Sequence, residues 1–582
     1  MNDIDKTNTD KNNRNNMNTN VNKNINVIKN DKDLKIISLG GFGHVTQNMY
    51  LYETPKDILI VDCGVGFPEE EMMGVDLVIP DISYLEDKKD KIRGIVLSHG
   101  HDDHIGALPY LLPKLPDNLP VYGPRWAIAL TKLKLQDFSL KANLKEFDEQ
   151  SRLKLGAFSL SFIKVTHSIP DTFHLVIETP LGIFYHAADF KLDLNPVIGQ
   201  PSNQDRMKQV GEKGVTCLLS DCLRAENPGF TPPEAELSEM FTKEIADCKG
   251  KFLVTTISSN ISRLKQAVDV SIKNNRKVVL VGRSIEKSFE IAQKLKYIEY
   301  PANTFVKKKE IKRYPPHLLT LLVAGSQGQV GSSLDRIVAD EMDLIKVESG
   351  DKIIFSTDYI PGNETAIYSL IDNLYRLGAE VVYQDIRSNI HVSGHGSQED
   401  LAKLMKMLNP KYLLPIGGNY RHIYAYQRLA QKKGFNKDQV IMADSGQVVH
   451  FNSQGLVDLR ERVEVRQVMV DALGIGDVGN IVLRDRKILA EEGMVVAIIP
   501  FDQSSCQLIG DPEVVSRGFV YIKDNLPLLK QAQKRIKQLV RDLGNRRADY
   551  RFIRRKVQGE LEEFFFKNTG RRPMVLVVMI EA

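Results

Sequence analysis

The chain carries in its first third the stretch Ser98-His99-Gly100-His101-Asp102-Asp103-His104. This stretch follows an apolar run at 94–97 that is typical of a buried strand, and it precedes a run at 105–112 that is typical of the start of a helix. The strand fixes the position of the loop, and alternate loop residues can point at one centre. Three imidazoles and a carboxylate are ligands that suit zinc or manganese. The pattern therefore predicts a metal site and favours a metal-dependent hydrolase.

Three further polar residues, Asp62, His167 and Asp189, follow other apolar runs of strand type. Each has an ordinary structural interpretation when it is taken singly, as a turn cap or as a satisfied histidine. Taken with the histidine stretch, His167 and Asp189 predict that several strand ends meet at the same edge of a sheet and share one metal centre, whereas Asp62 could orient a metal ligand or cap a turn.

The length of 582 residues corresponds to about three or four domains. The net charge of only +4 means that a nucleic-acid surface must come from local clustering of basic residues. No apolar stretch reaches the roughly 18 residues of a membrane span, and the N-terminus has no apolar signal core. The scattered cysteines favour free thiols in a reducing cytoplasm over a disulfide framework: Cys63, Cys217, Cys222, Cys248 and Cys506.

Composition changes along the chain and suggests its organisation. Residues 1–33 contain twelve asparagines and almost nothing apolar, which is typical of a disordered tail. Strand and helix patterns then alternate, as in an α/β protein, and a second α/β block covers about 233–385. The last part, 476–582, has the pattern of a separate domain. There, residues 523–572 hold fifteen Lys/Arg against six Asp/Glu, as expected either for a solvated helix face or for a surface that contacts RNA or a partner subunit.

Three loops of small polar residues have two interpretations. Gly325-Ser326-Gln327-Gly328 and Pro361-Gly362-Asn363-Glu364 are either ordinary turns or loops whose backbone N–H groups hold phosphates. The third, His391-Val392-Ser393-Gly394-His395, adds two imidazoles and a hydroxyl, which favours an anion pocket near a metal.

From 34 to 582 the chain resembles the ribonuclease J family, a group of the metallo-β-lactamase superfamily with an inserted beta-CASP domain. The resemblance rests on the segment Asp62 to Asp81, on Pro361-Gly362-Asn363-Glu364, on His391 to His395 and on Arg571-Arg572-Pro573-Met574. It implies an α/β protein in which a metallo-β-lactamase αββα sandwich is interrupted by an α/β beta-CASP domain and followed by an α+β C-terminal domain. The implied limits are 34–232 and 386–455 for the sandwich, 233–385 for the insert, 456–475 for a linker and 476–582 for the last domain.

The resemblance also implies roles for single residues. His99, His101 and His167 would hold one divalent ion, Asp103 and His104 would hold a second, and Asp189 would bridge them with its two oxygens. Asp62 would orient this centre from behind. Asp221 and His395 match two beta-CASP motifs, with His395 as a proton donor to the leaving oxygen. The loop formed by His391, Val392, Ser393, Gly394 and His395 would bind a substrate phosphate.

The chain departs from the family pattern in two places. In the segment Pro415-Ile416-Gly417-Gly418-Asn419-Tyr420-Arg421, Gly417 occupies the place of a histidine that normally binds the second ion. Glycine offers no ligand, so water or the nearby His422 would have to take that place. Ser262 replaces a histidine that relatives usually carry.

The expected function is a zinc- or manganese-dependent ribonuclease of RNA maturation and decay. It would work as a 5′-to-3′ exonuclease that prefers a 5′-monophosphate, with internal cleavage as a second mode. The alternative is a weakened paralogue that serves as an RNA-binding or regulatory subunit beside an active homologue. A small-molecule hydrolase is disfavoured, because a small substrate needs neither the insert nor the basic C-terminal part. Expected partners are RNA and other subunits, in a homodimer, a homotetramer or a hetero-oligomer, without a membrane.

Replacing His101 with alanine tests the metal site. The variant should lose bound metal and any hydrolytic activity, because an imidazole at the centre is removed. Metal content and hydrolysis are measured on the same sample. Unchanged values of both would contradict the assignment.

Overall fold

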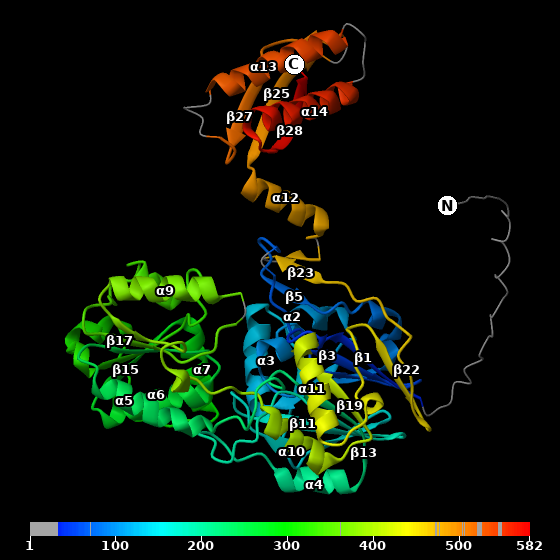
Figure 1. Ribbon diagram of the computed structural model, residues 1–582, viewed down its shortest axis with the longest axis vertical. Helices are drawn as coiled ribbons and strands as arrows, with labels where there is room; N and C mark the ends of the chain where they lie inside the picture. The colour runs from blue at the N-terminus through cyan, green and yellow to red at the C-terminus, as the bar shows by residue number, and fades with distance from the viewer. Residues whose placement is uncertain are drawn as a thin grey trace, which may run out of the picture.

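The computed structural model describes residues 33–581 except 70, 361, 472, 473, 477, 503, 504, 506, 521–525 and 545–549. The asparagine-rich tail expected at 1–33 therefore lies, apart from residue 33, outside the described residues, as do Glu70, Pro361 and Cys506. Figure 1 shows a sandwich of two sheets with an α/β unit beside it and a C-terminal unit beyond the helix α12 (Asn480–Glu491).

Two sheets face each other in the sandwich. The first has the order β22-β21-β1-β3-β4-β6-β7-β8 and the second the order β19-β13-β12-β11-β10-β9. The strands of the first are β1 (Leu34–Gly40), β3 (Met49–Glu53), β4 (Ile58–Val61), β6 (Ile92–Val96), β7 (Pro120–Pro124), β8 (Asn143–Phe147), β21 (Val448–Asn452) and β22 (Gly455–Asp458). Those of the second are β9 (Arg152–Leu155), β10 (Phe158–Val165), β11 (Thr172–Thr179), β12 (Gly182–Ala187), β13 (Val215–Asp221) and β19 (Tyr412–Ile416).

Helices cover the outer faces of both sheets. One apolar core lies between the sheets, and one lies under each helical layer. The helices outside the first sheet are α1 (Asp102–Ile105), α2 (Leu108–Leu111) and α3 (Arg125–Asp137); those outside the second are α4 (Gln204–Glu212), α10 (Gln398–Leu408) and α11 (Tyr420–Lys432). The arrangement is the expected αββα sandwich, and buried and half-buried residues alternate over the first five residues of β10, in agreement with a strand's period of two.

The inserted unit is built on a five-stranded parallel sheet of order β15-β16-β14-β17-β18. Its strands are β14 (Phe252–Thr255), β15 (Lys277–Val281), β16 (Leu319–Val323), β17 (Lys352–Phe355) and β18 (Glu380–Val382). Its helices are α5 (Leu237–Ala246), α6 (Ile261–Lys273), α7 (Arg283–Lys294), α8 (Ser333–Val338) and α9 (Glu364–Arg376). Apolar cores on both faces explain why these strands read as continuous hydrophobic runs.

The C-terminal unit joins a small sheet to two long helices. Its elements are β25 (Met494–Asp502), β26 (Gln507–Leu508), β27 (Glu513–Arg517), α13 (Leu526–Gly544), α14 (Tyr550–Thr569) and β28 (Met574–Glu581). Both helices pack against the same face of the sheet, in agreement with the strict burial alternation along β25. Among the described helices, none combines the length and the apolar character needed to cross a bilayer.

Two local features differ from the sequence expectations. The helix after the histidine stretch begins at Asp102 rather than near 105, so Asp103 and His104 lie in its first turn and not in the loop. The stretch 456–475, expected as a linker, contains the end of β22 together with β23 (Val468–Asp471) and β24 (Gly474–Ile475). Strand β23 pairs with β5 (Leu77–Ile79), so this part of the chain is fixed to the sandwich.

Candidate metal centre

The expected ligands meet at one edge of the sandwich because several strands end there. Asp62 follows β4, and the histidine stretch follows the parallel neighbour β6. From the opposite sheet, His167 lies two residues after β10, and Asp189 lies two residues after β12. The order of the strands therefore brings together residues that are more than 100 positions apart.

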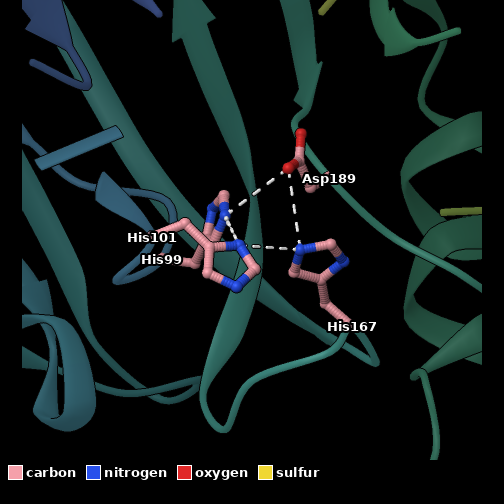
Figure 2. A group of neighbouring side chains, drawn as sticks. All are labelled: His99, His101, His167 and Asp189. Atoms are coloured by element: carbon pink, nitrogen blue, oxygen red, sulfur yellow. Dashed lines mark hydrogen bonds and ion pairs between the residues drawn. The ribbon is translucent and has the colours of Figure 1, made fainter. Parts of the chain in front are cut away.

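Four donors form the first group: His99, His101, His167 and Asp189, whose ligand atoms all lie within 4.8 Å of one another. Figure 2 shows their side chains pointing toward one centre. His101 Nδ1 lies 3.1 Å from His99 Nε2 and 3.0 Å from His167 Nε2, and both of those nitrogens lie 3.6 Å from Asp189 Oδ2. Ligand atoms of a tetrahedral zinc site lie about 3.3 Å apart, so the spacing fits an ion of this kind.

Hydrogen bonds behind the centre fix the tautomers of three imidazoles. His167 Nδ1 donates to the carbonyl of Gly394 at 2.8 Å, and His104 Nδ1 lies 2.8 Å from Asp62 Oδ2, so the Nε2 atom of each ring faces the centre. The Ser98 hydroxyl lies 2.9 Å from His99 Nδ1 and donates to the same Asp62 oxygen. Asp62 thus lies behind the donor group in contact with Ser98 and His104, and its role in orienting a metal centre stays a prediction.

A second group contains Asp103, His104 and Asp189. His104 Nε2 lies 3.6 Å from Asp103 Oδ2 and 3.5 Å from Asp189 Oδ2. The same Asp189 oxygen faces both groups, whereas the sequence expectation divided its two oxygens between two ions. Asn48 Nδ2 lies 3.2 Å from His104 Nε2 and 3.4 Å from Asp103 Oδ2, where it can hold the Asp103 carboxylate in place.

The electrostatics of the buried cluster favour a cation. Burial lowers the pKa of His99 and His167 well below the usual range and that of His101 to about 4, so these rings are neutral and their lone pairs are available. His104 is the exception: burial opposes its charged form, but Asp189, Asp103 and Asp62 outweigh burial and raise its pKa well above the usual value. Three carboxylates around one imidazole create a demand for positive charge that a divalent ion can meet.

Next to the centre, His395 pairs with Asp221, which ends β13. His395 Nδ1 lies 2.8 Å from Asp221 Oδ2, and its Nε2 lies 3.9 Å from Asp189 Oδ2. Burial disfavours the imidazolium, but the Asp221 and Asp189 carboxylates outweigh it and raise the pKa of His395 to about 9. Beside these two carboxylates, the protonated form of His395 is favoured at neutral pH.

The loop from His391 to His395 borders a cavity of about 1530 Å³ between the sandwich and the inserted unit. His391, Ser393, Gly394 and His395 line this cavity, together with His101, Asp103 and Asp189. Val392 does not line it, because its side chain is buried in a core of the inserted unit. Arg263 of α6 donates hydrogen bonds to His391 Nδ1 and to the Val392 carbonyl and thereby holds the loop in place. Nothing in the sequence indicated this role.

Gly417 has an open space in front of it. Its φ of +63° lies in the left-handed region, and a Cβ built there would have Asp189 Oδ1, at 4.0 Å, as the single heavy atom within that distance. A side chain at this position would thus point toward the shared carboxylate. His422 does not take its place, because its Nδ1 accepts from the Asn419 N–H at the start of α11 and its Nε2 lies 3.6 Å from Glu226.

Family models match four segments of the chain. They are the metallo-beta-lactamase superfamily at 43–199, the ribonuclease J beta-CASP domain at 249–374, the Zn-dependent metallo-hydrolase RNA specificity domain at 378–441 and the ribonuclease J C-terminal domain at 481–582. Ribonuclease J2 of Bacillus subtilis (strain 168) is 35% identical over 556 residues, which cover 95% of this chain and 99% of that protein. The chain belongs to the ribonuclease J family.

Other matches agree with this placement. Ribonuclease J 2 of Staphylococcus aureus (strain NCTC 8325 / PS 47) is 34% identical over 556 residues, with 95% of this chain and 99% of that protein covered. A solved structure of a protein of unknown function from Enterococcus faecalis V583 has a TM-score of 0.52 at 15% identity and covers 72% of this chain and 100% of that chain, which supports the fold alone. Membership of the ribonuclease J family makes the protein a metal-dependent hydrolytic ribonuclease and confirms the expected family.

Gly417→His tests the missing ligand. Because the first group has three imidazoles and the second has one, the second ion should bind more weakly in the wild type. A histidine at 417 has room and is tolerated in the left-handed region better than a β-branched residue. It should raise the affinity for the second ion about 10- to 100-fold and raise the hydrolytic activity.

Calorimetric titration with manganese or zinc measures this effect. Gly417→Ala is the matched control, since it adds a Cβ and the same backbone strain without a donor. If the wild type binds both ions with equal affinity and the histidine variant binds the second ion no more tightly, another group already completes the second site.

Proposed function

We propose that the protein hydrolyses RNA as a 5′-to-3′ exonuclease that prefers 5′-monophosphorylated ends, with internal cleavage as a second mode, in RNA maturation and decay. One observation carries this proposal: the two donor groups and the His391–His395 loop open into the same cavity between the sandwich and the inserted unit. An RNA end held by that loop would have its phosphodiesters beside the metal ligands. The site residues are proposed in the roles that the family resemblance implies.

The size of the cavity supports a polymer substrate. Its volume of about 1530 Å³ exceeds the roughly 300–1,000 Å³ of small-molecule pockets. The RNA specificity domain matched at 378–441 points in the same direction. Both observations weigh against a small-molecule hydrolase of the lactamase kind.

The proposed cofactors are two divalent ions, zinc or manganese. His99, His101 and His167 would hold one, Asp103 and His104 the other, and Asp189 both. Such a pair supplies an activated water and neutralises charge on the attacking and leaving oxygens. The protein contributes His395, which lies beside the centre in its protonated form and would donate that proton to the leaving 3′ oxygen. Asp221 holds the imidazole in the required orientation.

A second candidate function is that of a weakened paralogue, an RNA-binding or regulatory subunit of a ribonuclease J complex. The missing donor at Gly417 favours it, because a poorly held second ion would reduce hydrolysis without changing the RNA-binding cavity. We also propose a cytoplasmic location and assembly as a homodimer, a homotetramer or a hetero-oligomer with a homologue.

A nuclease assay on 5′-monophosphorylated RNA, with metal content measured on the same sample, separates the two functions. Degradation by metal-loaded protein supports the enzyme. Binding of the RNA without cleavage, at metal concentrations that fill both sites, supports the regulatory subunit.

The pH profile tests His395 as the proton donor. A general acid works while it is protonated, so activity should fall as pH rises through the pKa of His395. In Asp221→Asn the carboxylate that raises this pKa is gone, so the decline in kcat/KM should begin at lower pH than in the wild type. His395→Ala is the control and should lack this limb. An unchanged alkaline limb in Asp221→Asn would contradict the assignment.

End recognition is tested with Ser393→Ala. The wild type should degrade 5′-monophosphorylated RNA faster than 5′-triphosphorylated RNA, and the variant should narrow the difference because a hydroxyl is removed from the proposed phosphate loop. Rates on 5′-hydroxyl RNA serve as the reference. Equal wild-type rates on both phosphorylated ends would count against a monophosphate pocket.

A further inference from the structure

His391, one of the residues expected to bind phosphate, has both ring nitrogens engaged within the protein. Arg263 Nη1 lies 2.6 Å from His391 Nδ1. A guanidinium group only donates hydrogen bonds, so Nδ1 must be the acceptor. The ring proton of neutral His391 is therefore on Nε2, which is the donor that a phosphate would need.

That donor faces a carboxylate. His391 Nε2 lies 3.1 Å from Asp358 Oδ2. Asp358 follows β17 of the inserted unit and lines the same cavity as Ser393 and His395. Burial raises the pKa of Asp358, but the hydrogen bond and charge of His391, with Arg224 and Arg263, outweigh it and leave the pKa below the usual value. Asp358 is thus an anion with the acceptor chemistry of a phosphate oxygen.

Asp358 is not needed to orient His391, because Arg263 already does so. Arg263 is buried, and all five of its N–H donors have acceptors: two on Glu234, the Ser356 carbonyl, His391 Nδ1 and the Val392 carbonyl. The loop and the ring are held from this side whatever lies at Nε2. A carboxylate on the other side of the ring therefore needs a different explanation.

We propose that Asp358 is a specificity-determining residue that competes with a 5′-phosphate for the Nε2–H of His391. The inference rests on the proposed function, since it deepens the assignment of the His391–His395 loop as the end-binding site. An incoming phosphate either displaces Asp358 against like-charge repulsion or binds through Ser393 and the loop backbone alone. Asp358 thereby lowers the affinity for phosphorylated ends, while unphosphorylated ends are unaffected.

Binding of adenosine 5′-monophosphate and of adenosine to the metal-loaded protein tests the proposal by calorimetry. Asp358→Ala frees His391 and should raise the affinity for the monophosphate about three- to tenfold, as expected for removing one nearby like charge. The affinity for adenosine should not change. Asp358→Asn should give a smaller gain, because its amide oxygen still accepts from Nε2 without the charge. In a His391→Ala background, Asp358→Ala should give a smaller gain than in the wild type, because only the like-charge repulsion is removed and no Nε2–H is freed.

Asp444→Ala is the matched control. Asp444 lines the same cavity but is held by Arg462 at 2.9 Å, so its loss should leave the preference for monophosphate over adenosine unchanged. Monophosphate binding in Asp358→Ala that is weaker than, equal to or as undetectable as that of the wild type would overturn the proposal. Neither ligand is cleaved, so a parallel nuclease assay reports separately on the proposed function.

Discussion

The arrangement of the site depends on the shared position of one buried carboxylate. Asp189 Oδ2 lies within 3.9 Å of a ring nitrogen from each of four histidines, His99, His104, His167 and His395. With Asp62 and Asp103 nearby, negative charge gathers at a strand edge where Asp62 and Asp189 are buried. Such a cluster is costly to bury unless cations compensate it. Three of the four histidines, all except His395, reach Asp189 because several strands of the two sheets end at the same edge.

The inserted unit is coupled to this centre through a continuous set of hydrogen bonds. Arg263 in α6 binds the backbone of the His391–His395 loop at Val392, and Gly394 of the same loop accepts from His167. The orientation of a metal ligand in the sandwich thus depends on a guanidinium group in the other unit. Such a link would keep the His391–His395 loop and the candidate ligand His167 in a fixed relation at the cavity between the two units.

The sequence sufficed for the features that depend on local pattern. Apolar runs ending in His, Asp or Ser predicted strand ends, and parallel neighbours in a sheet end at the same edge. The roles proposed for Asp221 and His395 came from the family resemblance and not from local pattern. Arg263 could not be recognised, because its role depends on five acceptors spread over more than 150 positions. The start of α1 was placed too late, because the polar residues 102–104 lack the hydrophobic pattern that marks a helix.

Gly417 shows where sequence and structure together say more than either alone. The sequence has glycine where the family pattern has a histidine donor, and His422 was a possible replacement for that donor. The structure removes that replacement, because His422 accepts a backbone N–H at the start of α11 and faces Glu226. It also places the glycine in a left-handed conformation, with open space toward Asp189. The centre therefore keeps a complete donor set on one side of Asp189 and an incomplete one on the other. If two ions bind as proposed, this geometry predicts an asymmetric pair, with the weaker position on the side of Asp103 and His104.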